Sequence, residues 1–462
     1  MRHLALVVSL AALYGCSSPE RVAETPDSAG DTSGETLPDT SVPDVDGSAD
    51  APTDAKPCEG GLECLRPTCS AGATTSLSGI VYMPNGKVPL YNAMVFIPNA
   101  PLPAMAVGAT CDRCGVPPGG SPLAIDLTKT DGKFTLNNVP AGAKIPLVVQ
   151  IGKWRRQTEV EIKPCEANVL TDPELTRLPR NRKEGNLPKI AVTTGGCDKL
   201  ACILPKIGID ATEYGVDGAD AAVHFYAGSG GTGGPAGMKP AKTLWDSTPK
   251  LMDYDLALFS CECSEAPDSK SATSYAAVSA YLGAGGRIFT TDFQYNWYKQ
   301  SPDPKMQAMA TIPGGAPTAE NPVTLQLDFA KGKALASWMV AVDKTYPFAK
   351  VTCDYVFGNI TDVPDKSVAQ VYATSGSSPP SGLSYPRFVS VNAPAGRPVG
   401  SQCGKAVHLD AHINQKDTLD ASFPKGCTSP LTAGEQAFAF FLFDVGACLQ
   451  DDTKDPVVPP LK

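Results

Sequence analysis

The stretch DLALFSCECSE, residues 255–265, places two cysteines and a glutamate directly after an apolar run. In an α/β enzyme, a cysteine at the end of a strand can serve as a nucleophile, because its thiolate attacks carbonyl carbon. In an exported protein, a cysteine is more often half of a disulfide. The chemistry open to Cys261 and Cys263 therefore depends on the compartment in which the chain folds.

Acidic residues and a histidine stand at the ends of these apolar runs. Glu262 lies between the two cysteines, Asp292 ends RIFTTD, and Asp410 and His412 belong to VHLDAH. Asp410 with His412 could bind a metal ion or act as an acid–base pair beside Asp292. A neutral histidine hydrogen-bonded to a neighbouring carboxylate is the more ordinary interpretation. His408 would lie ~13 Å from His412 along one strand, at about 3.3 Å per residue, so we predict no shared metal ion and no cofactor.

Trp154, Arg155 and Arg156 form a candidate ligand patch, because aromatic and guanidinium groups together suit sugars or carboxylates. A strand with the indole packed inward and the guanidinium groups outward is the alternative. The glycine-rich stretch GSGGTGG (228–234) lacks the Lys-Ser/Thr pair that completes a P-loop, so we expect an ordinary loop there.

The N-terminus indicates export. Arg2 and His3 precede an apolar run that is too short to span a bilayer and has the length of a signal-peptide core. The run ends in Leu-Tyr-Gly-Cys, which resembles a bacterial lipobox, so Cys16 is the predicted lipidation site. Ser17 after that cysteine favours the outer membrane, on its periplasmic face or at the cell surface. The membrane, reached through the lipid anchor, is thus an expected partner.

Residues 17–57 hold no aromatic residue, and their ten acidic residues against Arg21 and Lys56 give a net charge of −8. Such a segment cannot bury enough apolar surface to offset its ordering entropy, so we predict a disordered tether. The whole chain carries −9, which leaves the remainder close to neutral. Without a basic surface, nucleic acid is not an expected partner.

Fifteen cysteines occur, and the fourteen beyond the lipid site allow up to seven disulfides in an exported chain. We therefore predict disulfides among Cys58, Cys64, Cys69, Cys111, Cys114, Cys165, Cys197, Cys202, Cys261, Cys263, Cys353, Cys403, Cys427 and Cys448. Four of them belong to one rim of a sheet, where we expect the pairs Cys202–Cys261 and Cys197–Cys263. A bridged Cys261 could not act as a nucleophile.

Residues 72–165 show the alternation and turn signals of short strands, as in LSGIVYMPNGKV and TKTDGKFTL. They predict an antiparallel β-sandwich. The hairpin T-x-x-D-G-x-F-x-L-x-x-V-P-x-G, from Thr128 to Gly142, resembles carboxypeptidase regulatory-like (transthyretin-like or CnaB-like) domains. That resemblance implies a spacer or a binding module without catalytic apparatus.

Residues 188–450 alternate apolar runs with helical segments, which predicts an α/β domain with a mostly parallel sheet. Strands are expected over 189–194, 221–227, 255–260, 287–291 and 406–413, and helices over 198–207, 244–252, 272–282, 329–342 and 432–448. The order resembles flavodoxin-like sheets and class I glutamine-amidotransferase-like domains. No glycine flanks Cys261 to permit the nucleophile elbow of that class, which argues against a catalytic thiol.

The whole chain from residue 58 is similar to a family of uncharacterised bacterial surface lipoproteins, through VVQIGKWRRQ, GGRIFTTDFQYNW and FFLFDVGACL among other motifs. We expect a signal peptide (1–15), a lipidated tether (16–57), a cysteine-rich segment (58–71), the sandwich (72–165), a linker (166–187), the α/β domain (188–450) and a tail (451–462). The leading hypothesis is a non-enzymatic lipoprotein that binds carbohydrate, peptidoglycan or surface proteins, or that scaffolds the envelope. The alternative is a hydrolase or amidase using Glu262, Asp292, Asp410 and His412.

Overall fold

The computed structural model describes residues 61–70, 72–231, 233–315, 318–377 and 382–461. The predicted signal peptide, the lipidation site Cys16, the tether and Cys58 lie outside the described residues. The described residues form one compact unit. Among the described helices, none has both the length and the apolar character needed to cross a bilayer.

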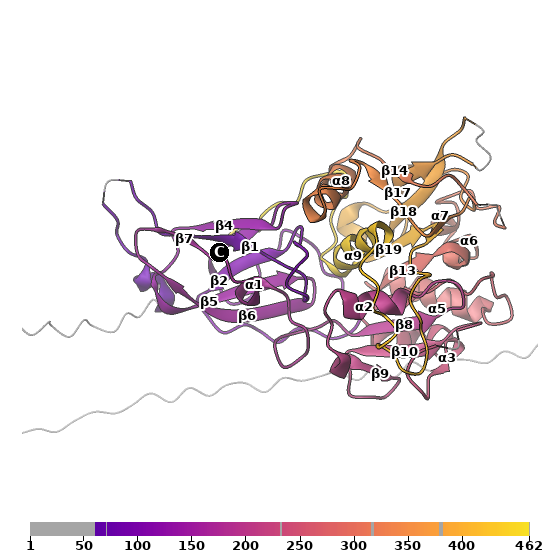
Figure 1. The fold of residues 1–462 in the computed structure, drawn as a ribbon, viewed down its shortest axis with the longest axis horizontal. Helices are drawn as coiled ribbons and strands as arrows, with labels where there is room; N and C mark the ends of the chain where they lie inside the picture. The colour runs from indigo at the N-terminus through magenta and orange to yellow at the C-terminus, as the bar shows by residue number, and fades with distance from the viewer. Residues whose placement is uncertain (1–60, 71, 232, 316–317, 378–381, 462) are drawn as a thin grey trace, which may run out of the picture. The chain divides into compact units, whose positions relative to one another are not determined.

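The first β region consists of two small sheets (Figure 1). One sheet has the order β3 (Pro122–Leu127), β2 (Met94–Pro98), β5 (Gly142–Ile151), β6 (Trp154–Ile162), with antiparallel pairing throughout. The other has the order β4 (Lys133–Asn137), β1 (Ser76–Ile80), β7 (Ala167–Val169). The region is β-rich, as predicted. It departs from the predicted antiparallel pairing at β7, which runs parallel to β1.

The inward faces of these sheets follow directly from the alternation in the sequence. In β4, Phe134 and Leu136 are buried while the residues between and beside them are exposed. They join one hydrophobic core with Val95 of β2 and Val149 of β5. Gly132 opens β4 at φ +76°, a backbone conformation that the Asp-Gly turn signal anticipates.

The second region is built on one large sheet. Its parallel part has the order β11 (Lys239–Pro240), β10 (Val223–Ala227), β8 (Ile190–Thr194), β12 (Leu256–Phe259), β13 (Arg287–Thr291), β19 (Gly404–Leu409), and β9 (Tyr214–Val216) pairs with β10. Antiparallel strands then extend it: β18 (Tyr385–Ala393), β17 (Ala369–Ser375), β14 (Val323–Leu325) and β15 (Lys350–Val351). The expected parallel core is present, and the antiparallel extension was not anticipated.

Helices cover both faces of the parallel strands. Neighbouring residues of β13 pack into different hydrophobic cores. The Phe289 ring packs edge-on against Phe438 of α9 (Ala433–Gly446), with 4.4 Å between the ring centroids. Ile288 lies in the core that includes Val278 of α5 (Ala272–Gly283). The predicted capping box of α9 is confirmed, since the side chains of Thr432 and Glu435 each accept from the other's backbone. A sheet covered on both faces explains why its strands read as continuous apolar runs.

The remaining elements are short, apart from α8. They are α1 (Pro173–Thr176), α2 (Ile203–Lys206), α3 (Lys242–Trp245), α4 (Thr248–Met252), α6 (Asn296–Lys299), α7 (Pro304–Gln307), α8 (Ala330–Val342), β16 (Tyr355–Val356), β20 (Ala411–His412), and the 3₁₀ turns η1 (Gly61–Leu65), η2 (Leu200–Cys202), η3 (Ala211–Glu213), η4 (Asp292–Tyr295) and η5 (Val399–Ser401). The helix expected over 244–252 is wrong in one respect: it is two helices, because Ser247 caps a new one that begins with a proline in its first turn.

Five disulfides join described residues: Cys69–Cys165, Cys111–Cys403, Cys114–Cys448, Cys197–Cys263 and Cys202–Cys427. Cys64 is also bridged. The pair Cys197–Cys263 is as predicted, but Cys202–Cys261 is wrong, because the loop before α9 brings Cys427 to Cys202. Cys261 and Cys353 are the free cysteines of the described chain, so two of the fourteen disulfide candidates are not paired.

Candidate functional site

The candidate catalytic residues meet at the carboxyl ends of the parallel strands. Cys261 and Glu262 follow β12, Asp292 follows β13, and Asp410 and His412 follow β19. The strands β10, β8, β12, β13 and β19 have the order 2-1-3-4-5, whose direction reverses between β8 and β12. Doubly wound sheets place ligands at such a reversal. Here all five side chains are buried, with residue exposures between 0% and 5%.

Cys261 contacts a carboxylate, and not a histidine. Its thiol donates to Oδ2 of Asp292 at 3.2 Å, and the backbone N–H of Cys263 donates to its Sγ at 3.3 Å. Burial, followed by the charge of Asp292, raises the pKa of the Cys261 thiol far above its ordinary value. The thiol is therefore protonated at neutral pH, which does not suit a nucleophile.

Asp292 is the centre of the network. His412 Nε2 lies 2.9 Å from Oδ2, and Asn359 Nδ2 donates to Oδ1 at 2.9 Å. The same Asn359 nitrogen donates to Oδ1 of Asp410 at 2.7 Å. Asp292 itself has φ +42°, a left-handed conformation that is costly for a residue with a Cβ. The structure thus brings Cys261, Asp292, Asp410 and His412 together, as the spacing of strand ends predicted.

Asp410 is the most enclosed member of this set. Burial raises its pKa to about 6 from an ordinary 3.8, although the Asn359 amide, the Ile360 backbone N–H and the Arg387 guanidinium oppose that rise. The Ile360 N–H lies 3.2 Å from Oδ2, and Arg387 Nη1 lies 3.8 Å from it. The oxygens of Asp410 are therefore engaged by protein donors on each side.

Glu262 makes its contacts with a different set of groups. It forms a buried ion pair with Lys270, and its Oε1 accepts from the backbone N–H of Ser229 at 2.5 Å. Gln294 Nε2 donates to Oε2 at 3.1 Å. Burial lowers the pKa of Lys270, whose ammonium also lies 5.4 Å from the centre of the Trp245 ring. Glu262 is thus placed as a structural anion, and Ser229 of the glycine-rich loop is held to it.

His412 is oriented from its far side by Gln415. The amide Nε2 of Gln415 donates to the backbone oxygen of Cys197 and lies 2.7 Å from Nδ1 of His412. An amide NH₂ can only donate, so Nδ1 accepts and Nε2 carries the ring proton toward Asp292. This tautomer directs the ring N–H of His412 to the carboxylate of Asp292.

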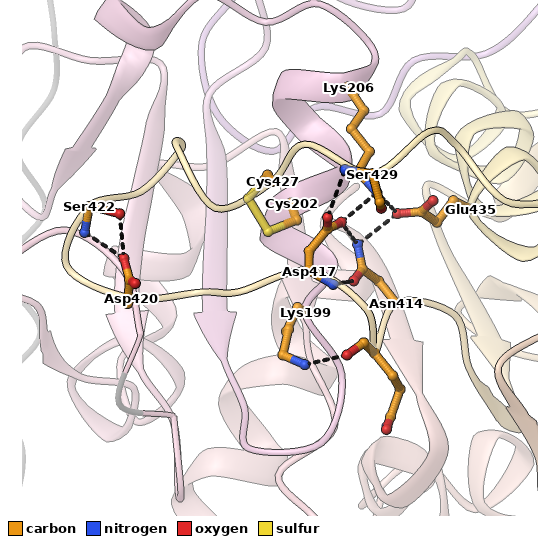
Figure 2. Close-up of a disulfide and its surroundings, with 11 residues drawn as sticks. Lys199, Cys202, Lys206, Asn414, Asp417, Asp420, Ser422, Cys427, Ser429 and Glu435 are labelled. Atoms are coloured by element: carbon orange, nitrogen blue, oxygen red, sulfur yellow. Dashed lines mark hydrogen bonds and ion pairs between the residues drawn. A yellow bond between two sulfur atoms is a disulfide. The ribbon is translucent and has the colours of Figure 1, made fainter.

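The segment that carries Gln415 is anchored beside α2 (Figure 2). Lys206 forms ion pairs with Asp417 and Glu435, and Asn414 Nδ2 donates to both of these carboxylates at 2.7 and 2.6 Å. The disulfide Cys202–Cys427 closes the same loop. The position of His412 therefore depends on a cluster that lies outside the strand ends.

His408 does not join the network. Its Nδ1 lies 2.9 Å from the Thr290 hydroxyl, and burial lowers its pKa to about 3, so it is a neutral core histidine. The spacing along the strand predicted that His408 and His412 would lie apart, and the structure does not bring them to one site.

A cavity of about 330 Å³ lies elsewhere, against the four-stranded sheet. Its walls come from all four strands of that sheet, from the insert between β2 and β3, and from residues that follow α9. They include the apolar side chains of Met94, Met105, Val116, Pro117, Leu127 and Val457. Arg113, Arg155 and Gln450 supply polar groups, and a volume near 300 Å³ is at the lower end of small-ligand sites.

The structure places the three residues of the predicted ligand patch, Trp154, Arg155 and Arg156, in different surroundings. Arg155 lines the cavity, although its Nη2 also donates to the Pro103 carbonyl at 2.8 Å. Trp154 is buried, and its ring lies 4.9 Å from that of Phe443. Arg156 donates to the Glu174 carbonyl at 2.7 Å. The indole therefore packs inward, and one of the two arginines reaches the cavity.

Sequence reasoning missed Asn359, Gln415, Arg113 and Gln450. Arg113 sits between two cysteines, whose distant partners Cys403 and Cys448 alone place it at the cavity. Among the described side chains, Gln450 Nε2 is buried without a hydrogen-bond partner. No local pattern marks any of the four.

Comparison with known proteins does not assign the chain to a family. No family model matches the chain, and no curated protein matches it. Among solved structures, the carbohydrate deacetylase Agd3 is 14% identical with a TM-score of 0.27, and the match covers 49% of this chain and 29% of that one. A type II cohesin–X-dockerin complex from Acetivibrio cellulolyticus is 13% identical with a TM-score of 0.15, covering 32% of this chain and 79% of that one. The chain spans under a third of the deacetylase, and likenesses this low assign neither fold nor activity.

Proposed function

We propose that this protein is a non-enzymatic binding protein of the bacterial envelope, held at the outer membrane by a lipid on Cys16. Its five described disulfides fit a protein that folds outside the cytoplasm. Its ligand occupies the cavity against the four-stranded sheet. The observation that carries this proposal is that the cavity combines apolar walls with polar groups, whereas the strand-end carboxylates are buried and already bonded.

The polar groups of the cavity define the class of ligand. Arg113 and Arg155 are guanidinium donors that line the cavity. Donors of this kind suit carboxylates and sugar hydroxyls, and the proline and methionine walls suit a sugar ring or a short peptide. An acidic saccharide, or a peptidoglycan fragment with its carboxylates, meets both requirements.

A hydrolase acting through the α/β domain is the second candidate, because Cys261 is unbridged and shares Asp292 with His412. The thiol nevertheless donates to the carboxylate, and burial keeps it protonated. Hydrolysis also needs a substrate within reach of the reacting atoms, and these are 0–5% exposed. The geometry therefore favours binding over turnover.

The test is retention of the full chain on immobilised peptidoglycan and on an array of acidic and neutral glycans. Arg113→Ala removes one cavity guanidinium and should weaken retention at least about tenfold, the loss of one charge-assisted contact. Arg397→Ala, an exposed arginine outside the cavity, is the matched control.

The outcomes separate the candidates. Unchanged retention of the Arg113 variant would contradict the cavity, and no retention of the wild-type protein on any polymer would contradict binding itself. Release of sugars or peptides by the wild-type protein, lost in Asp292→Asn, would establish the hydrolase.

A further inference from the structure

We infer that the ligand of this protein occupies two adjoining cavities and is a sugar joined to a short peptide that ends in a carboxylate. This is the chemistry of a peptidoglycan fragment with its peptide stem. The inference rests on the proposed function and chooses between the two ligand classes named there. The first cavity is the one against the four-stranded sheet. The second, of about 300 Å³, is lined by the chain before β8, the turn between β9 and β10, and the insert between β2 and β3.

The two cavities share part of their walls. Met105, Ala106 and Lys153 line both of them. Arg155 of the first cavity is also bonded to Asn186 of the second, from Nε to Oδ1 at 3.3 Å and through two backbone hydrogen bonds. A single layer of residues therefore separates the cavities, and a ligand of two parts can place one part in each.

Lys189 gives the second cavity a positive charge that no carboxylate of the described residues neutralises. Two other cations in the walls of this cavity are already paired. Lys153 Nζ lies 2.5 Å from Oδ1 of Asp255. Arg182 Nη1 lies 2.6 Å from Oδ1 of Asp220. The carboxylate of the ligand therefore pairs with the Lys189 ammonium.

The remaining walls of the second cavity suit a small peptide. His224 adds no charge, because burial lowers its pKa and its Nε2 lies 3.0 Å from the Ala219 carbonyl oxygen. The apolar side chains are mostly small, and they include Leu187, Ala219, Ala221 and Ala222. A sugar ring needs several donors and acceptors for its hydroxyls, whereas a peptide end with small side chains needs an apolar wall and one cation.

The rims of both cavities carry exposed apolar side chains. Val107 of the second cavity is 74% exposed, and Val457 of the first is 73% exposed. They are the two most exposed large apolar side chains of the described residues. Exposed apolar side chains beside a cavity are typical of a binding surface. A ligand that spans both cavities contacts both rims, whereas a ligand confined to one cavity leaves the other rim in water.

Three soluble probes separate the parts of such a ligand: a peptidoglycan disaccharide with its peptide stem, the same disaccharide without the peptide, and the free peptide. Calorimetry uses the full chain with its disulfides intact. We expect the complete fragment to bind at least about tenfold more tightly than either part, because its second part binds at a high effective concentration.

Lys189→Gln removes the ammonium and should abolish this gain in affinity, while the affinity for the disaccharide stays unchanged. Lys183→Gln is the matched control, because Lys183 is exposed, belongs to the same segment and lines neither cavity. If Lys189→Gln does not fold, Val107→Asp decides, because a carboxylate on the exposed rim repels that of the ligand. Val169→Asp is its control, at an exposed valine of β7 outside both cavities.

Equal affinities for the fragment and the disaccharide would overturn the two-cavity ligand and leave the proposed function standing. The same holds for a free peptide that binds as tightly as the complete fragment, for a gain that survives in Lys189→Gln or Val107→Asp, and for its loss in either control. Absence of binding by all three probes would also overturn this inference, and retention on the glycan array then decides whether the proposed function stands.

Discussion

Replacing Glu262 by Gln tests whether this residue is a structural anion or a catalytic acid. Its partner Lys270 is 4% exposed, and after the change its ammonium retains the Glu265 carbonyl at 3.1 Å and the rings of Trp245 and Trp297. Removing one partner of a buried ion pair leaves an uncompensated charge, which costs about 3–5 kcal/mol. We expect Glu262→Gln to lower the free energy of unfolding by that amount.

The assay is urea unfolding followed by tryptophan fluorescence, with all disulfides oxidised. The double variant Glu262→Gln/Lys270→Met removes the charge as well as its partner, and it should recover most of the loss. Glu63→Gln is the control, because that side chain is 61% exposed and its pair with Arg66 is 3.7 Å long. It should change stability by less than about 0.5 kcal/mol.

Two results would refute this reasoning. A loss below about 1 kcal/mol in Glu262→Gln would mean that the ammonium is hydrated or relaxes to another anion. A double variant as unstable as the single one would mean that the loss comes from packing or from the Ser229 contact, and not from the unpaired charge.

Three further predictions concern the core and the cysteines. The pKa of Asp410 is about 6 in the folded protein against an ordinary 3.8, so the folded state holds this proton to higher pH than the unfolded chain does. The stability that this provides is complete below about pH 4 and is lost as pH rises to about 6. Urea unfolding should therefore show the wild-type protein losing up to ~3 kcal/mol relative to Asp410→Asn between pH 4 and pH 7; a constant difference would contradict it. Phe441→Ala, in a fully buried ring 4.9 Å from Tyr372, should cost about 3–5 kcal/mol, and a cost near that of Phe348→Ala at a 58% exposed ring would contradict the packing. Alkylation of the denatured, unreduced chain should label Cys261 and Cys353 among residues 61–461, as peptide mass spectrometry can show, and labelling of any other cysteine there would contradict the pairing.

Local patterns were sufficient for much of the fold. The strands β8, β10, β12 and β13 and the helices α5, α8 and α9 lie where hydrophobic runs and caps predicted them. They were predictable because a strand buried on both faces reads as a continuous apolar run and a helix buried along one face has a helical period, and both signals are local in the sequence. The strand expected over 406–413 is divided, because β19 ends at Leu409 and β20 (Ala411–His412) pairs with β16 in another sheet. The antiparallel strands β14–β18 were missed. Strands β14, β15 and β16 are only two or three residues long, and buried polar residues such as Arg387 and Ser390 interrupt the apolar pattern of the longer β18.

The candidate site shows the same division. Strand ends predicted that Asp292, Asp410 and His412 would meet, since the carboxyl ends of parallel strands share one edge of the sheet. The partners that decide their chemistry come from loops: Asn359 bridges the two carboxylates, and Gln415 orients the imidazole. A loop's side chain has no periodic signal, so its contact could not be read from spacing.

The sequence by itself determined a β-rich region followed by an α/β region, and cysteines typical of an exported chain. Only the tertiary structure decided the partner of Cys202. Cys202 and Cys427 are 225 residues apart, and their bond depends on where the loop before α9 returns to the sheet. Because that loop takes the partner expected for Cys261, a free thiol is left beside Asp292. The position of that loop depends on how the whole domain packs, so no single stretch of the sequence determines it.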